Sequence, residues 1–501
     1  MHSMILIALL LAPLFASALT ALLRGRRAME TIHLVSAAVM FGLSVELAAE
    51  VLAAGGVSWG DGFLYADHFS ALVALLTGFV YLVSAPYAVG YFRRDAADKT
   101  FEQIGNDRAT ERKLFQYYAL APLFGFSMFL VVLANNLGVM WVAIEGTTLA
   151  SIFLVTFYGR PTSLEAAWKY AMIGSVGLSM ALFGTILTYY SAYQVLGMDT
   201  LNALNWSALV TNAARFDKNV MRLAFILVLL GFGTKAGLAP MHTWKPDAYG
   251  EAPIPAVVLM AAALLNCAIY ALARFYVLTV HCLGPSFPSR LLILFGLLSM
   301  AVAVPFVLVQ RSFRRLLAYS SIDHGGIMVL GLGFGGALGA LGMLLHMTFH
   351  SITKPLLFFC AGNAQQHLGT DSLKKNPGGL IHSLPLSAPL FLLATLAVTG
   401  TPPFSLFQSE FTILRAGFAA QHTTASILLV VFLVSIFCGF FAHIAQLVLG
   451  PPNGRPRDED SRWKTYPALG LALVVIVIGF WLPAPLFALV EGAARVLEVR
   501  P

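Results

Sequence analysis

The sequence predicts an all-α, polytopic membrane protein with about fourteen transmembrane helices, arranged as two inverted five-helix repeats that each contain a broken helix. The first observation is composition: 58% of the 501 residues are hydrophobic and only 11% are charged, which is outside the range of soluble domains. The second is that long apolar windows recur along the whole chain, so no soluble domain of any size is expected. The third is that prolines interrupt two of these windows close to an ionisable residue.

The windows are long enough to cross a bilayer as helices. A helix needs roughly 20 apolar residues to span a hydrocarbon core of about 30 Å. In chain order the fourteen windows run over 3–23, 30–54, 66–92, 114–134, 136–159, 164–194, 219–242, 253–278, 289–310, 316–335, 336–361, 384–418, 422–449 and 466–493. They lack the short alternating segments of a transmembrane barrel. We do not interpret the first as a signal peptide, because no small-residue cleavage site stands out.

The order of the windows predicts four parts of the chain. Residues 1–113 form an N-terminal three-helix segment, and residues 114–278 form the first five-helix repeat. Residues 289–449 form the second repeat. Residues 450–501 hold a cytoplasmic loop and the last helix.

The basic residues predict the orientation. Twenty Lys and Arg residues, Lys245 and Arg314 among them, fall in loops on one side of the predicted membrane, and five fall on the other side. Because loops rich in Lys and Arg stay in the cytoplasm, we expect a multi-pass protein of the cell inner membrane with both termini periplasmic. The net charge of +7 then reflects topology. The lipid bilayer is the expected partner, and no nucleic acid is expected.

Several kinds of site are not expected. The four cysteines are scattered and form no CxxC pair, so neither a disulfide framework nor an iron–sulfur or zinc site is indicated. The glycine-rich runs 231–237 and 331–339 do not follow a strand, unlike a nucleotide fingerprint. His346 and His350 are spaced i, i+4, but the glutamate of the zinc-protease motif is missing. We therefore expect no metal and no catalytic residue for covalent chemistry.

Ionisable residues inside the windows are the candidate functional groups. A charge at the bilayer centre costs about 2.5–3.5 kcal/mol even on the mildest scale. The groups inside the windows are Glu145, Lys169, Lys235, His324, His346, His350, Lys354 and Glu410. Arg222, Arg274 and Arg415 lie nearer to the ends of windows, where they and Lys169 can reach the interface. Glu145 and Lys235 lie too deep for that explanation, which favours a functional role.

The eleventh window carries a polar stripe. His346, His350 and Lys354 are spaced i, i+4 and i+8, so they share one helix face over about 12 Å. Histidine both accepts and gives a proton near neutral pH. His324 of the tenth window can add a similar group. The stripe predicts a path for protons along the helix.

Two helix breaks accompany these residues. Pro240 follows Lys235 and should leave carbonyls near residue 236 without helical partners. Pro402 and Pro403 precede Glu410 in the twelfth window. Both breaks occupy the fourth place of a five-helix repeat, a pattern typical of transporters built from inverted repeats, in which broken helices line a polar cavity.

The motifs also resemble a known family. The run 231–255, "GFGTKAGLAPMHTWKPDAYGEAPIP", resembles the signature KxGxxPxHxWLPDAxxxAPxP of the antiporter-like subunits of respiratory complex I, a family that includes cation/proton antiporter complexes and membrane-bound hydrogenases. Around Glu145, "WVAIEGTTLASIFLV" is similar to the fifth helix of that family, and "AAWKY" to the sixth. "RRLLAYSSIDHGG" and "HSITKPLLFFCAGN" match the tenth and eleventh helices. The resemblance covers most of residues 115–415. It is greatest to the F component of hydrogenase-4 and formate-hydrogenlyase-type complexes, and Glu410 is similar to the M-type complex I subunit.

The resemblance implies a function. It implies a lateral proton path in which Glu145 and Lys235 form a switching charge pair and His324, His350, Lys354 and Glu410 continue the axis. His242 and Asp247 are secondary candidates. Asn266 stands where the family has a lysine or histidine in the eighth helix, so either water bridges that place or pumping is weakened.

The resemblance also implies partners. We expect this chain to bind no cofactor, with iron–sulfur clusters and nickel–iron or flavin held by other subunits. Expected partners are further membrane subunits and a soluble redox arm. A subunit of a sodium/proton antiporter and a non-pumping scaffold for a redox arm are the alternative interpretations.

Overall fold

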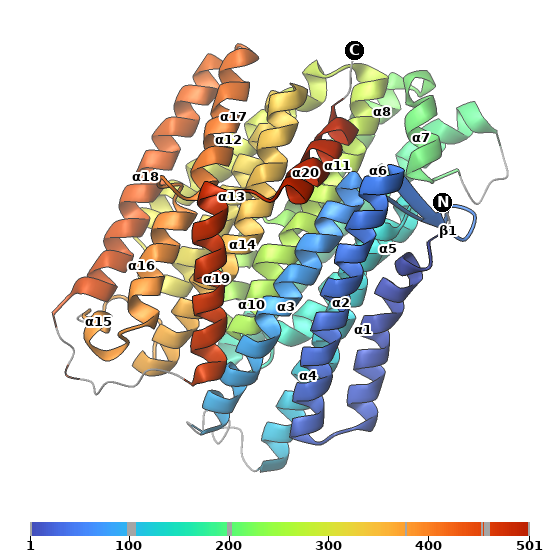
Figure 1. The fold of residues 1–501 in the computed structure, drawn as a ribbon. Coiled ribbons are helices and arrows are strands. Elements are labelled where there is room, and N and C mark those ends of the chain that lie inside the picture. The colour runs from blue at the N-terminus through green and yellow to red at the C-terminus, as the bar shows by residue number, and fades with distance from the viewer. Residues whose placement is uncertain are drawn as a thin grey trace.

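The computed structural model describes residues 3–97, 107–197, 203–375, 378–451, 454 and 461–498. These residues form a bundle of long helices with one short hairpin at its edge (Figure 1). The N-terminal segment contains α1 (Ile5–Leu22), α2 (Arg26–Ala54), β1 (Gly56–Trp59), β2 (Leu64–Asp67) and α3 (His68–Ala97). The two strands are antiparallel, with Gly56 opposite Asp67.

The middle of the chain contains the first broken helix. Its elements are α4 (Asp107–Leu133), α5 (Leu137–Val155), α6 (Pro161–Leu196), α7 (Trp206–Asn212), the 3-10 turn η2 (Ala213–Arg215), α8 (Lys218–Ala236), α9 (Trp244–Glu251), α10 (Ile254–Leu259), the π-helical turn η3 (Met260–Leu264) and α11 (Leu265–Leu283). The span Ile254–Leu283 is buried along its whole apolar window. It therefore forms the centre of the bundle.

The second half contains the other broken helix. Its elements are α12 (Ser286–Leu308), α13 (Phe313–Phe334), α14 (Gly336–Leu368), α15 (Leu380–Ser383), α16 (Ser387–Val398), α17 (Ser405–Ala419), α18 (Thr423–Leu449), α19 (Arg462–Phe480) and α20 (Ala484–Leu497). In α12 and α18 about a third or less of the apolar window is buried. Exposed apolar helix surface of this kind suits a lipid environment.

The all-α membrane class is confirmed. Among the described residues, eleven helices are long and apolar enough to cross a membrane. The number fourteen, the inverted relation of the repeats and the division at residues 113, 278, 289 and 449 stay predictions. Both expected breaks are present, between α8 and α9 and between α16 and α17.

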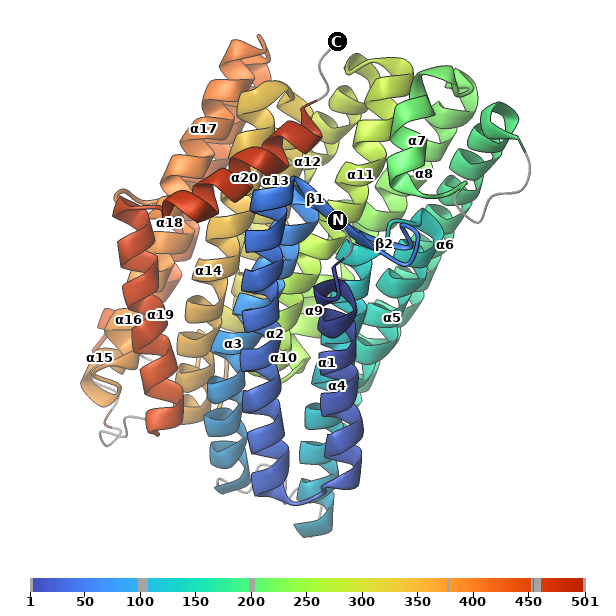
Figure 2. The ribbon, with the colours of Figure 1, turned by 45° about the vertical axis from the view of Figure 1, so that its right-hand side comes forward.

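The last predicted window is wrong in one respect. Residues 466–493 do not form one helix, because α19 ends at Phe480 and α20 begins at Ala484, after Pro483. Figures 1 and 2 show α20 lying across the bundle, where it contacts α3 and α14. Proline cannot continue the hydrogen-bond ladder of the preceding helix, so the chain changes direction there.

A buried ion pair ties the N-terminal segment to the centre. Arg274 of α11 donates to both carboxylate oxygens of Asp67, at 2.7 Å each. Burial alone would raise the pKa of Asp67, but the guanidinium and the backbone amides of Ser70 and Phe69 outweigh it and lower the pKa. The expectation that Arg274 reaches the membrane interface is therefore wrong. A partner from a distant part of the sequence allows it to stay buried.

Candidate functional site: a buried polar axis

Side chains of α9 compensate the first helix break. The carbonyl of Thr234 accepts from Trp244 Nε1 at 2.9 Å, and the carbonyl of Ala236 accepts from Lys245 Nζ at 2.8 Å. The break follows Gly237, whose φ of +76° is the left-handed conformation that ends many helices. The prediction that carbonyls near residue 236 lose their helical partners is confirmed, and two side chains replace those partners.

Lys235 lies beside this break and is buried. Its Nζ donates to Thr148 Oγ1 and to the hydroxyl of Tyr170, both at 2.7 Å. Tyr170 in turn lies 2.8 Å from Ser151 Oγ. The side chain is thus held by hydroxyl groups of α5 and α6.

Glu145 lies one turn before Thr148 on α5 but does not pair directly with Lys235. Among the described residues, no carboxylate lies within 4.0 Å of Lys235 Nζ. Oε2 of Glu145 is buried and has no hydrogen-bond partner in the same part of the chain. In this structure, therefore, hydroxyl groups surround the ammonium of Lys235, and Glu145 and Lys235 do not form an ion pair.

Lys169 occupies the mouth of a polar cavity. Its side chain is 45% exposed and pairs with Glu165 at 2.6 Å and with Asp247 at 3.3 Å, and Asp247 also pairs with Arg315. The cavity measures about 290 Å³ and lies among residues of α6, α9, α13 and α14, Glu251 and Gln365 included. Lys169 is thus not buried with Lys235, and the secondary candidate Asp247 lines the same cavity as Lys169. His242, the other secondary candidate, is buried.

The polar stripe of α14 is buried and meets α13. Lys354 Nζ donates to Ser320 Oγ at 2.9 Å. His346 Nε2 lies 2.9 Å from His324 Nδ1, and the His350 ring is centred 5.1 Å from the His324 ring. Neither ring nitrogen of His350 has a partner among the described residues. The three histidines therefore lie together where α13 meets α14, and their role with Lys354 in a proton path stays a prediction.

Neighbouring groups fix the order of donors at the histidine pair. Ser409 Oγ donates to the carbonyl of Leu406 at 2.8 Å, so it can only accept from His346 Nδ1, which lies 3.0 Å away. A neutral His346 then has a free lone pair on Nε2. His324 Nδ1 must carry the proton that this lone pair accepts. This assignment follows from the hydrogen-bond network.

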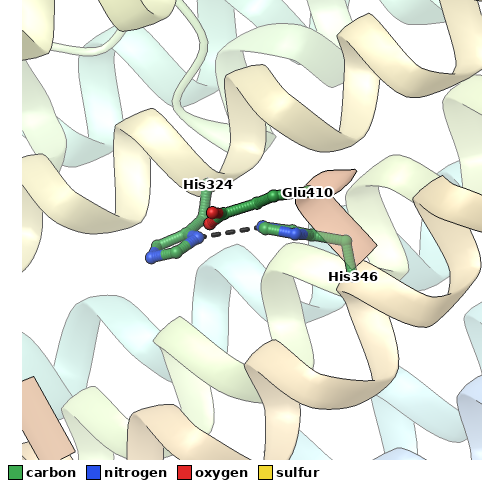
Figure 3. A group of neighbouring side chains, drawn as sticks. All are labelled: His324, His346 and Glu410. Carbon is green, nitrogen blue, oxygen red and sulfur yellow. Dashed lines mark hydrogen bonds between the residues drawn. The ribbon is translucent and has the colours of Figure 1, made fainter. Parts of the chain in front are cut away.

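Glu410 closes the row at the second break. Its carboxylate lies against Gly400, where φ is +65° and an added Cβ would overlap the carboxylate. Figure 3 shows Glu410 beside His324 and His346, and one ligand atom from each lies within 4.8 Å of the others. The carboxyl group also lines a cavity of about 330 Å³ between α17 and α18. Two imidazoles and a carboxylate could hold a small metal ion. The same spacing brings proton donors and acceptors together, and the expectation of no metal stays a prediction.

Comparison with known proteins identifies the family. Residues 134–437 match the family described as NADH:quinone oxidoreductase/Mrp antiporter, TM. The chain belongs to this family. A hydrogenase-4 component F homolog of Methylacidiphilum infernorum is 35% identical over 426 residues, which cover 84% of this chain and 86% of that protein.

Solved structures with the same fold come from multisubunit membrane complexes. A chain of the membrane-bound sulfane sulfur reductase, an archaeal respiratory membrane complex, matches with a TM-score of 0.85, 24% identity, and coverage of 99% of this chain and 98% of that chain. A chain of the Mrp complex of Dietzia sp. DQ12-45-1b matches with a TM-score of 0.84, 22% identity and the same coverage. The resemblance drawn from the motifs is confirmed. All predicted pathway residues lie within the range that matches the antiporter family.

Asn266 follows the π-helical turn of this antiporter-family chain. Its Nδ2 donates to Ala262 O at 2.9 Å and to Ser351 Oγ at 2.7 Å, whereas its Oδ1 has no partner among the described residues. Ser351 is the residue after His350 on α14. Asn266 therefore binds the polar stripe without contributing a proton of its own.

Some residues of the axis were missed from the sequence. Asp323 precedes His324 on α13 and is buried, with Oδ1 unpaired in the described part of the chain. Asp323 could have been selected from the sequence, because it is an ionisable residue inside the apolar window 316–335. Lys245 and Arg314 were assigned to solvated loops, and both are buried. They donate to backbone carbonyls around the first break. Arg222 and Arg415 are exposed, as expected.

Proposed function

We propose that this chain is a proton-translocating subunit of a redox-driven membrane complex of the hydrogenase-4 or complex I type. The observation that carries the proposal is a row of titratable groups from α5 to α17, of which Glu145 is partly exposed and the others are buried. It begins at Glu145 and Lys235 and ends at Glu410. Buried charges inside membrane helices are costly and mark ion pathways. The similarity to a hydrogenase-4 component F homolog and the match to the NADH:quinone oxidoreductase/Mrp antiporter family support the same assignment.

Protons would enter from the polar cavity at Lys169 and Asp247. This cavity lies at the same end of the membrane as the basic loops, which supports entry from the cytoplasm. In Figure 1, α1 runs down to the lower end of the bundle from about mid-height and α20 ends near the upper end. The first residues of α1 and the last of α20 thus both lie away from the lower end, which supports the proposal of periplasmic termini in an inner membrane.

The Glu145–Lys235 pair would drive the first step. An ion pair at about 4 Å with an effective dielectric near 20 is worth roughly 4 kcal/mol. Moving one charge against a membrane potential of 100 mV costs about 2.3 kcal/mol. Closing and opening the pair is therefore large enough to load and release a proton. The arrangement with Thr148 and Tyr170 around the ammonium is the open form.

The partners follow from this assignment. The chain would dock with further membrane subunits and a soluble redox arm, and iron–sulfur clusters with nickel–iron or flavin would lie in that arm. Purification of the tagged protein in mild detergent, with mass spectrometry of the proteins that accompany it, tests this. Redox subunits support the proposal, whereas antiporter subunits alone would replace it with a cation/proton exchanger.

Replacement of Lys235 tests the proton path. In inverted membrane vesicles with the complete complex, Lys235→Ala should lose redox-driven proton uptake while the complex still assembles. Arg222→Ala, an exposed cation on the same helix, is the matched control and should pump normally. Normal pumping by Lys235→Ala would leave only the scaffold interpretation. Uptake that requires sodium in the unaltered complex would favour the sodium-coupled one.

A further inference from the structure

Lys245 is a buried cation that the path described so far does not use. It lies at the start of α9, between the two halves of the chain. Its Nζ donates to Ala236 O at 2.8 Å and to Ser321 O at 3.3 Å. Ala236 follows Lys235, and Ser321 follows the serine that binds Lys354. The ammonium therefore contacts the backbone next to Lys235 and next to Ser320, the serine that binds Lys354.

The backbone is shaped to admit this side chain. Gly237 has a φ of +76°, and a Cβ added there would lie 2.6 Å from Lys245 Cδ and 3.3 Å from Nζ. The aliphatic part of the Lys245 side chain thus packs directly against the backbone of Gly237, and any residue with a Cβ at position 237 would overlap it. Lys245 Nζ also lies 5.7 Å from the centre of the Tyr249 ring.

Lys245 has no counter-ion in the described part of the chain. Its hydrogen-bond acceptors in that part of the chain are two neutral carbonyls. A buried ammonium without a carboxylate is costly to keep charged. α9 packs against α13, whose Ser321 carbonyl accepts from Lys245 and whose neighbouring Ser320 accepts from Lys354. Because like charges disfavour one another, a proton on Lys245 opposes a proton on Lys354.

The sequence supplies an independent reason for such a group. Asn266 cannot titrate, although the family resemblance places a lysine or histidine there. In the quoted signature a leucine follows the tryptophan, whereas this chain has Lys245. A titratable group is thus absent from α11 and present on α9.

We propose that Lys245 relays protons between the Lys235 and Lys354 segments of the axis, in the place that Asn266 leaves without a titratable group. This inference rests on the proposed function. The Lys245 amine accepts a proton from the Lys235 side, directly or through water, and its ammonium gives a proton to the Lys354 side. One N–H bond forms and one breaks, so charge is conserved and no redox partner is needed.

Two substitutions distinguish a proton relay from a structural tie, by which we mean that Lys245 only holds α8 and α13 together through its hydrogen bonds. Lys245→Leu removes both the titratable group and its hydrogen bonds. Lys245→Arg keeps a cation and donors for the two carbonyls, but a guanidinium does not release its proton in proteins. A relay predicts that both variants lose at least tenfold in protons moved per redox turnover. A structural tie predicts that Lys245→Arg pumps normally.

The experiment uses the complete complex in inverted vesicles, with proton uptake and redox turnover measured together and assembly checked on native gels. The double variant Lys245→Leu/Asn266→Lys, which returns the titratable group to α11, should regain proton uptake. Normal pumping by either single variant, or no gain in the double variant, overturns the inference. If Lys245→Leu does not assemble, Lys245→Arg decides. Normal pumping by Lys235→Ala would instead mean that the proposed function itself has failed.

Discussion

Replacing Tyr170 with phenylalanine removes one of the two hydroxyl groups that hold Lys235. The change deletes a single oxygen from a buried ring that stacks on Trp244 at 4.4 Å between ring centres. The ring and its packing remain. Lys235 then keeps one hydrogen-bond acceptor, Thr148 Oγ1 at 2.7 Å.

The size of the effect follows from the lost hydrogen bond. A hydrogen bond to a charged group contributes about 1.5–3 kcal/mol, and each 1.36 kcal/mol corresponds to a factor of ten. If the bond between Lys235 and Tyr170 stabilises the loaded lysine, Tyr170→Phe should slow proton uptake roughly tenfold to a hundredfold. Assembly should not change.

The assay is redox-driven proton uptake by inverted vesicles, followed with a pH-sensitive dye. Tyr118→Phe is the matched control, because the Tyr118 hydroxyl is buried and has no partner among the described residues. That variant should pump as the unaltered protein does. Equal rates for the two variants would refute a role for the Tyr170 hydroxyl in loading Lys235.

Two further substitutions test the second break and the ion pair at the edge of the centre. Gly400→Ala should displace the Glu410 carboxylate and lower proton uptake at least tenfold, whereas Gly369→Ala, at a similar φ of +69° with open space around it, should not; equal effects would assign the loss to backbone strain. Asp67→Asn should lower the free energy of unfolding by about 3–5 kcal/mol because it leaves Arg274 buried without its charge partner, measured as the melting temperature in detergent. Because the pKa of Asp67 is lowered in the folded protein, its contribution is present above the ordinary carboxyl pKa and is lost as the pH falls through the lowered value; a melting temperature independent of acid pH would contradict this.

The sequence was sufficient for the class of fold and for most of the ionisable groups of the axis, although Asp323 and Lys245 were missed. Apolar windows reveal helices because a bilayer demands length and composition, and a charge inside such a window is conspicuous. The prolines at residues 240 and 402 indicated the helix breaks, because proline inside an apolar window interrupts the helix. The last window failed because its composition stays apolar across Pro483, where the chain turns.

Other features depend on neighbours that are distant in the sequence. Arg274 appeared to be a residue of the interface because its partner, Asp67, precedes it by 207 residues. Lys245 follows the break at Pro240 and was taken for a loop residue, although α9 packs against α13 there. Hydroxyl groups such as those of Tyr170 and Ser409 carry no charge penalty, so composition gives no reason to select them.

The donor order at the histidine pair has a consequence for timing. When His324 Nδ1 gives its proton to His346 Nε2 and takes another on Nε2, it becomes the opposite tautomer. On the proposed path, once the proton on His346 Nε2 has moved on, two lone pairs face one another across 2.9 Å. A second proton cannot then follow by the same route until the His324 ring turns or exchanges its tautomer. On that path the pair would pass protons singly, with a recovery interval after each one.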